Sequence, residues 1–146
     1  MQIGVETARA VETKRVFVID DDDITRTVLQ FILQDDNETH DLATLAEAYA
    51  QGGRAQPDMV LLGLGIVERE GNVVLTNIAA RWPRARILLI AGPGQEATAQ
   101  DDLAPHAHAV LTKPFTVETV RRRVNAQFGR LAPATIQLHR VPVSAL

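Results

Sequence analysis

The chain has 146 residues, of which 46% are apolar and 23% are charged, as expected of a globular protein with a single hydrophobic core. Its net charge of −3, with acids and bases scattered along the chain, disfavours a nucleic-acid-binding protein. The absence of cysteine excludes disulfides and thiolate metal sites. No apolar run approaches the ~18 residues needed to span a bilayer, so we expect a cytoplasmic protein without membrane contact.

Four short apolar runs are bounded by charged or turn residues, and each has the length of a strand. They cover residues 16–19, 59–62, 87–91 and 107–111. Runs that are apolar at nearly every position are typical of strands buried on both faces of a parallel sheet. A weaker strand is expected at 39–43.

The segments between these runs predict helices. The first is capped by Asp22 or Asp23 and has its apolar positions at helical spacing up to residue 33. A weak helix at 45–51 is expected to stop at Gly52 and Gly53. Further helices are expected at 72–82, at 95–103, and at 116–128, the last with Thr116 as its cap and Gly129 as its stop.

Alternating strands and helices of this length predict an α/β fold, a doubly wound five-stranded parallel sheet with helices on both faces. In such folds the functional site lies at the carboxyl ends of the strands. Residues far apart in the sequence should therefore converge there, namely Asp20, Asp21, Gly63, Ala91 and Lys113.

Three motifs appear in order along the chain: VFVIDDDD at 16–23, PDMVLLG at 57–63 followed by EG at 70–71, and LTKPF at 111–115. In these motifs the chain resembles the receiver domain of two-component response regulators. The resemblance covers about residues 14–129, with an N-terminal extension at 1–13 and a C-terminal tail at 130–146. It implies a flavodoxin-like sheet with strand order 2-1-3-4-5.

The resemblance also assigns roles to residues at the expected site. Asp20 and Asp21 match the acid pair that holds a metal ion, and Lys113 matches the lysine that neutralises the phosphoryl oxygens. The position of the phosphoacceptor aspartate is occupied by Gly63. Glycine supplies no oxygen nucleophile for phosphoryl transfer.

The two switch positions of the family are also altered. Ala91 occupies the position of the hydroxyl residue that senses the phosphate in the family, and Val110 occupies the position of the aromatic switch residue. We therefore expect an atypical receiver, or pseudo-receiver, that is not an enzyme and has no catalytic residue. Magnesium would bind weakly or not at all, through Asp21, Asp20 and the carbonyl of Gly65. Equally, the acid pair would contact Lys113 or cap the first helix.

Two other functions stay open. One is a sensor of a small anion or nucleotide, held against Lys113 by two glycine loops that contain Gly63, Gly65, Gly92 and Gly94. The other is a conventional phosphorelay receiver that uses another acid. The candidates for that acid are badly placed, because Asp58 precedes Gly63 by five residues of strand, about 16 Å, and Glu68 and Glu70 lie beyond it.

The expected partner is a protein, such as a histidine kinase, another regulator or an output protein, and a homodimer is possible. By the resemblance, the contact face is formed by the last two helices and the last strand, with Val110, Arg121, Arg122 and Phe128 as its test residues. The tail includes Ile136, Leu138, Val141 and Val143 among polar residues. It is either a strand-like segment that pairs with an edge or another copy, or disordered.

Overall fold

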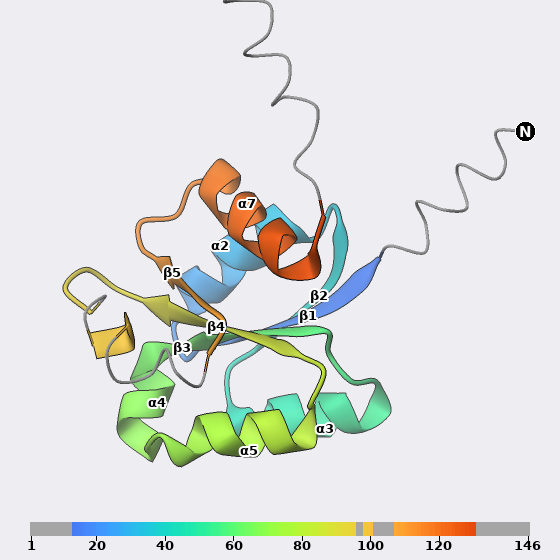
Figure 1. The fold of residues 1–146 in the computed structure, drawn as a ribbon, viewed down its shortest axis with the longest axis vertical. Helices are drawn as coiled ribbons and strands as arrows, with labels where there is room; N and C mark the ends of the chain where they lie inside the picture. The colour runs from blue at the N-terminus through green and yellow to red at the C-terminus, as the bar shows by residue number, and fades with distance from the viewer. Residues whose placement is uncertain (1–12, 96–97, 101–106, 131–146) are drawn as a thin grey trace, which may run out of the picture.

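Residues 13–95, 98–100 and 107–130 are described by the structure, a computed structural model. Five parallel strands form one sheet in the order β2-β1-β3-β4-β5, which confirms the predicted topology (Figure 1). The strands are β1 (Lys14–Ile19), β2 (Asn37–Leu42), β3 (Met59–Gly63), β4 (Arg86–Ala91) and β5 (Ala109–Thr112). Strand β3 therefore ends at the centre of the sheet.

Helices cover both faces of the sheet (Figure 1). One face carries α2 (Asp23–Leu33) and α7 (Val117–Phe128), and the other carries α3 (Leu45–Arg54), α4 (Leu64–Glu70) and α5 (Val73–Arg81). The helix expected at 95–103 falls mostly outside the described residues. Among those residues, no helix is long and apolar enough to cross a membrane.

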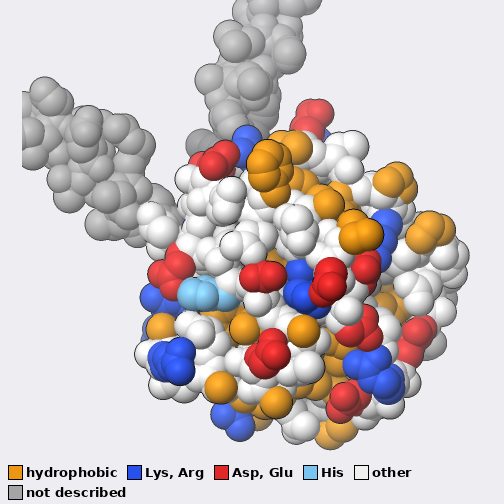
Figure 2. Space-filling view, turned by 180° about the vertical axis from the view of Figure 1, so that it is seen from behind, with side chains coloured by type: hydrophobic (Ala, Val, Ile, Leu, Met, Phe, Trp, Pro, Cys, Tyr) orange, Lys and Arg blue, Asp and Glu red, His pale blue; other side chains and the backbone are white. Residues whose placement is uncertain are grey.

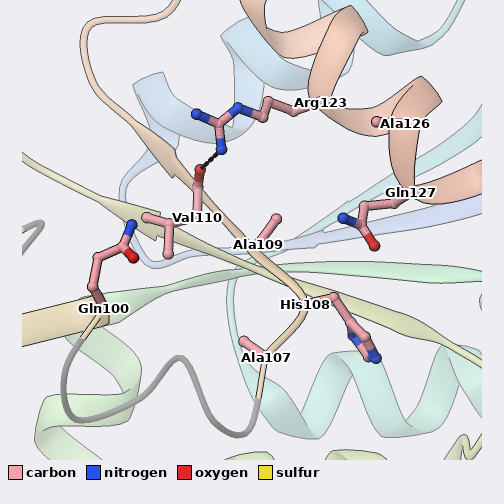
Figure 3. Close-up of a pocket in the computed structure, with 8 residues that line it drawn as sticks. All are labelled: Gln100, Ala107, His108, Ala109, Val110, Arg123, Ala126 and Gln127. Carbon is pink, nitrogen blue, oxygen red and sulfur yellow. Dashed lines mark hydrogen bonds between the residues drawn. The ribbon is translucent and has the colours of Figure 1, made fainter.

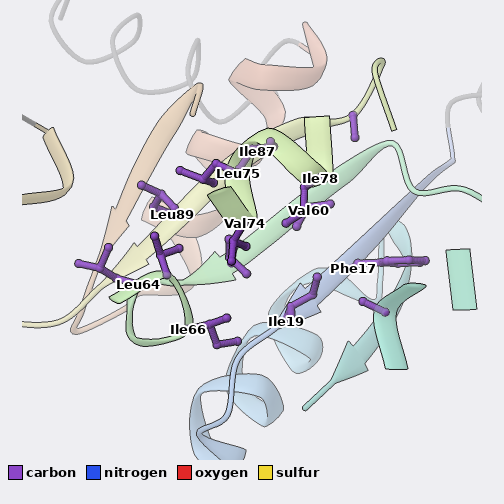
Figure 4. Packing of buried hydrophobic residues seen from close by; sticks show 14 of the residues in the cluster. Phe17, Ile19, Val60, Leu64, Ile66, Val74, Leu75, Ile78, Ile87 and Leu89 are labelled. Carbon is purple, nitrogen blue, oxygen red and sulfur yellow. The ribbon is translucent and has the colours of Figure 1, made fainter. Parts of the chain in front are cut away.

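The sheet divides the hydrophobic core into two clusters. Phe17 and Ile19 of β1 point into the cluster beneath α3, α4 and α5, whereas Val16 and Val18 point toward α2 and α7. All four side chains are fully buried. Figure 4 shows the first cluster, to which helices and strands both contribute. This burial on both faces explains why the strands read as unbroken apolar runs.

Side chains at the helix starts fix where α2 and α7 begin. A carboxylate oxygen of Asp22 accepts a hydrogen bond from the backbone N–H of Thr25 at 3.3 Å, so Asp22 caps α2. Thr116 caps α7 in the same way, and α7 ends at Gly129, whose φ of 73° lies in the left-handed region. The predicted caps and stop are confirmed.

Two predictions about glycines are wrong. Helix α3 continues through Gly52 and Gly53, because Gly52 packs against the indole of Trp82 and a Cβ there would lie 2.3 Å from Cζ2. Residues 64–70 form α4 instead of a loop. That short helix forms because Leu64 and Ile66 bury their side chains, each 1% exposed, against the sheet. The two loops of the predicted anion site are thereby reduced to one.

Candidate functional site

Asp20 and Gly63 lie side by side at the carboxyl end of the sheet, because β1 and β3 are neighbours and each ends there. The side chain of Asp20 is buried, with 6% of its surface exposed. A Cβ added to Gly63 would lie 2.4 Å from Oδ2 and 2.7 Å from Cγ of Asp20. The carboxyl group of Asp20 therefore fills the space in which a side chain at position 63 would begin.

Space alone calls for glycine at position 63. Its backbone angles, φ −64° and ψ 131°, are open to any residue. A larger residue would force the Asp20 carboxyl group to move. The absence of a phosphoacceptor side chain at position 63 and the placement of the Asp20 carboxyl group therefore depend on each other.

The hydrogen bond made by the carboxyl group of Asp20 comes from the backbone. Its Oδ1 accepts a hydrogen bond from the N–H of Asp22 at 2.9 Å. Burial raises its pKa above the ordinary value, and the Asp22 N–H and the charge of Lys113 only partly oppose this. The guanidinium of Arg26 donates to the backbone carbonyl of Asp20 at 2.7 Å, leaving the carboxylate itself without that cation.

The other acids at this end of the sheet pair with bases. Asp21 contacts Arg69 at 2.8 Å, and both side chains are about half exposed. Lys113 lies 3.8 Å from Asp22, so the predicted contact between Lys113 and the acid pair is made with the next residue along. Only Asp20 keeps a buried carboxyl group without an ion pair in the described part of the chain.

Sequence reasoning missed Arg26 and Arg69. Arg26 follows Asp23 by three residues on α2, a spacing that brings side chains together on a helix, and the two form an ion pair. That signal was present in the sequence. Arg69 gave no such signal, because its position depends on helix α4.

These residues do not fit a magnesium site in the arrangement they adopt. Asp20 is packed against Gly63, Asp21 is held by Arg69, and Gly65 lies in the first turn of α4, where its carbonyl belongs to the helical hydrogen-bond pattern. In the described ranges, no group of three or more His, Asp or Glu side chains could hold a metal ion. Weak magnesium binding through Asp21, Asp20 and the Gly65 carbonyl thus stays a prediction that these contacts do not favour.

The two altered switch positions are buried. Ala91 is fully buried at the end of β4 and accepts a hydrogen bond from the N–H of Lys113 at 2.9 Å. Val110 is 5% exposed in β5. Both switch side chains thus pack in the core, without a polar group to respond.

The backbone N–H of Gly92, one candidate anion ligand, already donates a hydrogen bond to Oε1 of Gln95 at 2.7 Å.

The four residues expected on the partner face differ in their exposure and contacts. Val110 is only 5% exposed, so its side chain offers little contact area. Arg121 turns toward the end of α2, where it lies 3.4 Å from Asp35, and Phe128 packs partly buried against the core cluster under α2 and α7. Arg122 is exposed, 3.8 Å from Glu118.

A hollow of about 410 Å³ lies between β5 and α7 (Figure 3). On its wall, Arg123 donates a hydrogen bond to the carbonyl of Val110 at 2.9 Å, which occupies one acceptor of this edge strand. The lining residues are Gln100, Ala107, His108, Ala109, Val110, Arg123, Ala126 and Gln127. The hollow adds a recognisable feature to the predicted face, one that the sequence did not indicate.

Comparisons with known proteins agree with this architecture. The family model of the response regulator receiver domain matches residues 16–125. Chemotaxis protein CheY of Listeria monocytogenes is 25% identical over 108 residues, covering 73% of this chain and 91% of CheY. Transcriptional regulatory protein SrrA of Staphylococcus aureus is 25% identical over 126 residues, covering 86% of this chain. The chain spans about half of SrrA, 52% of its length.

Solved structures show the same fold. A response regulator from Thermotoga maritima has a TM-score of 0.72 and 19% identity, covering 80% of this chain and 98% of its own. NtrX from Brucella abortus, in complex with ATP, has a TM-score of 0.72 and 23% identity. That match covers 88% of this chain but 28% of NtrX. At these identities the likeness concerns the fold alone.

Proposed function

Because the chain belongs to the response regulator receiver domain family, we propose that it is an atypical receiver, which signals through protein contacts without a phosphoacceptor on β3. Receiver domains in general are signalling domains without enzymatic activity of their own, and they interact with kinases and output proteins. Two-component signalling is thus the setting of this protein. The specific partner and the loss of phosphorylation are the parts that we propose.

One observation carries the proposal: the carboxyl group of Asp20 fills the space beside Gly63. Phosphoryl transfer needs an oxygen nucleophile with an open in-line approach and positive charge around the phosphoryl oxygens. Here β3 ends without a nucleophile, and Lys113 and Arg69 are each next to an aspartate. An arrangement in which the acids and bases of the pocket neutralise one another is suited to a fixed conformation.

The two alternative functions gain less support. A sensor of anions needs free N–H groups and free positive charge, whereas Gly92 is bonded to Gln95 and Gly65 lies inside α4. A relay through another acid is disfavoured, because Asp58 lies at the opposite end of the sheet. There its Oδ2 accepts a hydrogen bond from the backbone N–H of Arg15 at 2.7 Å. Asp20 itself is buried.

Partner contacts require a surface that offers both a concave shape and polar side chains. The hollow between β5 and α7 combines apolar alanines with the polar side chains of His108, Arg123 and Gln127. Buried anchors surrounded by polar groups are typical of protein contact sites. We therefore place the partner face at this hollow, with the exposed Arg122 beside it, and leave Val110 beneath as its support.

The decisive experiment records amide NMR spectra of the wild type and of Gly63→Asp during titration with magnesium and then beryllofluoride, which mimics an acyl phosphate. We expect the wild type to show no response at residues 20, 63 and 113, and Gly63→Asp to gain one. The gain has a reason: the new carboxylate repels Asp20, and a divalent cation relieves that repulsion. Asp58→Asn is the control, because this acid lies at the far end of the sheet.

The other outcomes are equally informative. A saturable response of the wild type to beryllofluoride at these residues would overturn the proposal in favour of a phosphorylated or anion-binding receiver. Intact-mass measurement after incubation with acetyl phosphate and magnesium separates those two. A phosphate adduct on the wild type indicates a relay, whereas a spectral response without an adduct indicates a sensor.

A further inference from the structure

Helix α2 exposes an apolar stripe on the side away from the sheet. Ile24 is 72% exposed, Val28 36% and Phe31 69%. Their spacing, i, i+4 and i+7, puts all three on one face of the helix, while Leu29, Ile32 and Leu33 bury the opposite side. Figure 2 shows hydrophobic side chains gathered on the molecular face that carries α2, with acidic ones among them. We call these three residues the α2 stripe.

Each end of the α2 stripe carries excess negative charge. At its end, Asp35 and Asp36 share the single guanidinium of Arg121, at 3.4 and 4.0 Å. At its start, Asp23 and Asp41 likewise share that of Arg26. In both places two carboxylates surround one guanidinium. A ligand for the stripe should therefore be apolar, with positive charge and without acids.

Residues 131–146 have that chemistry. They contain neither aspartate nor glutamate, one arginine, Arg140, and one histidine, His139, among apolar residues at 136, 138, 141 and 143. Residues 1–12 are less suitable, because they contain two glutamates and one arginine. A second copy of α2 is also less suitable, since pairing two stripes would bring net negative ends together.

The tail is also long enough. It begins after Arg130, two residues past the end of α7 at Phe128, and Arg121 lies seven residues, about 10 Å of helix, before that end. Arg121 in turn contacts Asp35, one helical turn from Phe31. Sixteen extended residues span up to about 50 Å, so the tail reaches the whole stripe with residues to spare.

We propose that residues 131–146 bind the α2 stripe of the same molecule, with Ile136 and Leu138 against Phe31 and Arg140 near an acidic end. The tail then covers α2, and a protein that binds this helix must first displace it. Intramolecular attachment favours this contact, because the effective concentration of a tethered segment reaches the millimolar range. The inference does not depend on the absence of a phosphoacceptor.

The natural absence of cysteine allows a direct test on the full chain. A nitroxide attached at Ser144→Cys marks the tail, and amide NMR then measures paramagnetic broadening along the chain. We expect strong broadening at Ile24, Val28 and Phe31 and little at Val73, a 56% exposed residue of α5 on the opposite face of the sheet. Phe31→Ser should reduce the broadening on α2 several-fold, whereas the matched control Val73→Ser should leave it unchanged.

Two further samples separate the possible sources of broadening. Isotope-labelled chain without nitroxide, mixed with unlabelled spin-labelled chain, reports only contacts between molecules. If α2 is broadened in this mixture, the tail contacts a second copy, and the proposal is overturned. Equal broadening of Val73 and the α2 stripe in the singly spin-labelled chain would overturn it as well. Ile136→Ser with Leu138→Ser in the spin-labelled chain should abolish the effect. Its persistence would also contradict the assigned contact.

Discussion

The two ends of the parallel sheet each contain a glycine pressed against a large or charged neighbour, and the two contacts differ in kind. At the amino end, Gly52 of α3 lies under the indole of Trp82, which is 2% exposed and packs edge-on against Phe17 at 5.6 Å. At the carboxyl end, Gly63 lies under the carboxyl group of Asp20. One neighbour is a rigid ring in an apolar core, and the other is a short polar side chain.

This difference separates structural roles from functional ones. The Gly52 contact buries apolar surface, which is favourable wherever it occurs. The Gly63 contact buries a carboxyl group, which costs free energy unless it is paired. Its place at the carboxyl end of the strands coincides with the site of the family. A polar group kept at a cost in that position points to the site, whereas the amino end is ordinary packing.

The largest expected effect is at the amino end. Gly52→Ala places a methyl group 2.3 Å from Cζ2 of Trp82, and the ring cannot turn away because Phe17 and Tyr49 surround it. We expect a loss of about 3 kcal/mol in the free energy of unfolding, at the upper end for overpacked cores. Urea unfolding followed by tryptophan fluorescence measures this loss directly.

The neighbouring glycine is the matched control. A Cβ at Gly53 meets no atom within 4 Å. Gly53→Ala should therefore be neutral or stabilise the protein by about 0.5–1 kcal/mol, the usual preference for alanine within a helix. Equal effects of the two substitutions would show that the ring contact does not constrain α3.

A smaller loss is expected from Gly63→Ala. Its methyl group also overlaps a neighbour, but the Asp20 carboxyl group can rotate toward solvent and release the clash. We expect a loss of about 1–2 kcal/mol. In an Asp20→Ala background the same substitution should cost almost nothing, so a double-mutant cycle from urea unfolding measures the contact.

Gly65→Ala serves as the control here, because a Cβ at Gly65 meets no atom within 4 Å. If Gly63→Ala were as harmless as Gly65→Ala in the wild-type background, Asp20 would not occupy the space beside Gly63. The carboxyl end of the sheet would then be open, and the main support for the proposed function would be lost.

The sequence predicted the sheet well because its signals are local. Unbroken apolar runs identified four strands, and Asp22 and Thr116 identified two helix starts. These features depend on residues within one turn or one strand. The edge strand β2 was placed less accurately, at 39–43 against Asn37–Leu42, because its sequence is mostly polar.

The site was harder to predict, because its contacts link separate elements. That Gly63 lies at the end of β3 follows from the sequence, but that Asp20 fills its side-chain space does not. Helix α4 has a glycine in its first turn, a poor helix former, and forms through burial of its apolar residues. Arg69 depends on that helix, so its pairing with Asp21 had no local signal.

The smallest expected effect concerns pH, and it has opposite signs at the two ends of the sheet. Burial raises the pKa of Asp20 above 3.8, so ionisation of this carboxyl group destabilises the folded state. The cost is absent below 3.8, grows as the pH rises from 3.8 to the raised pKa, and is fully present above it. At the amino end, hydrogen bonds from Arg15 and His40 lower the pKa of Glu38 from 4.5 to about 2. The stabilisation of the folded state by the Glu38 carboxylate is therefore fully present above pH 4.5 and is lost as the pH falls toward 2.

Two substitutions of a carboxyl group by an uncharged amide should therefore change the free energy of unfolding in opposite directions at pH 7. Asp20→Asn should be more stable than the wild type at pH 7, with a difference that disappears below pH 3.8. Glu38→Gln should be less stable at pH 7, by under about 1 kcal/mol because this ion pair is partly exposed and screened by solvent. Urea midpoints at pH 7 and pH 3 test both. A destabilised Asp20→Asn at pH 7 would mean that the Asp20 carboxylate is stabilised by its neighbours, and the contrast between the two ends would fail.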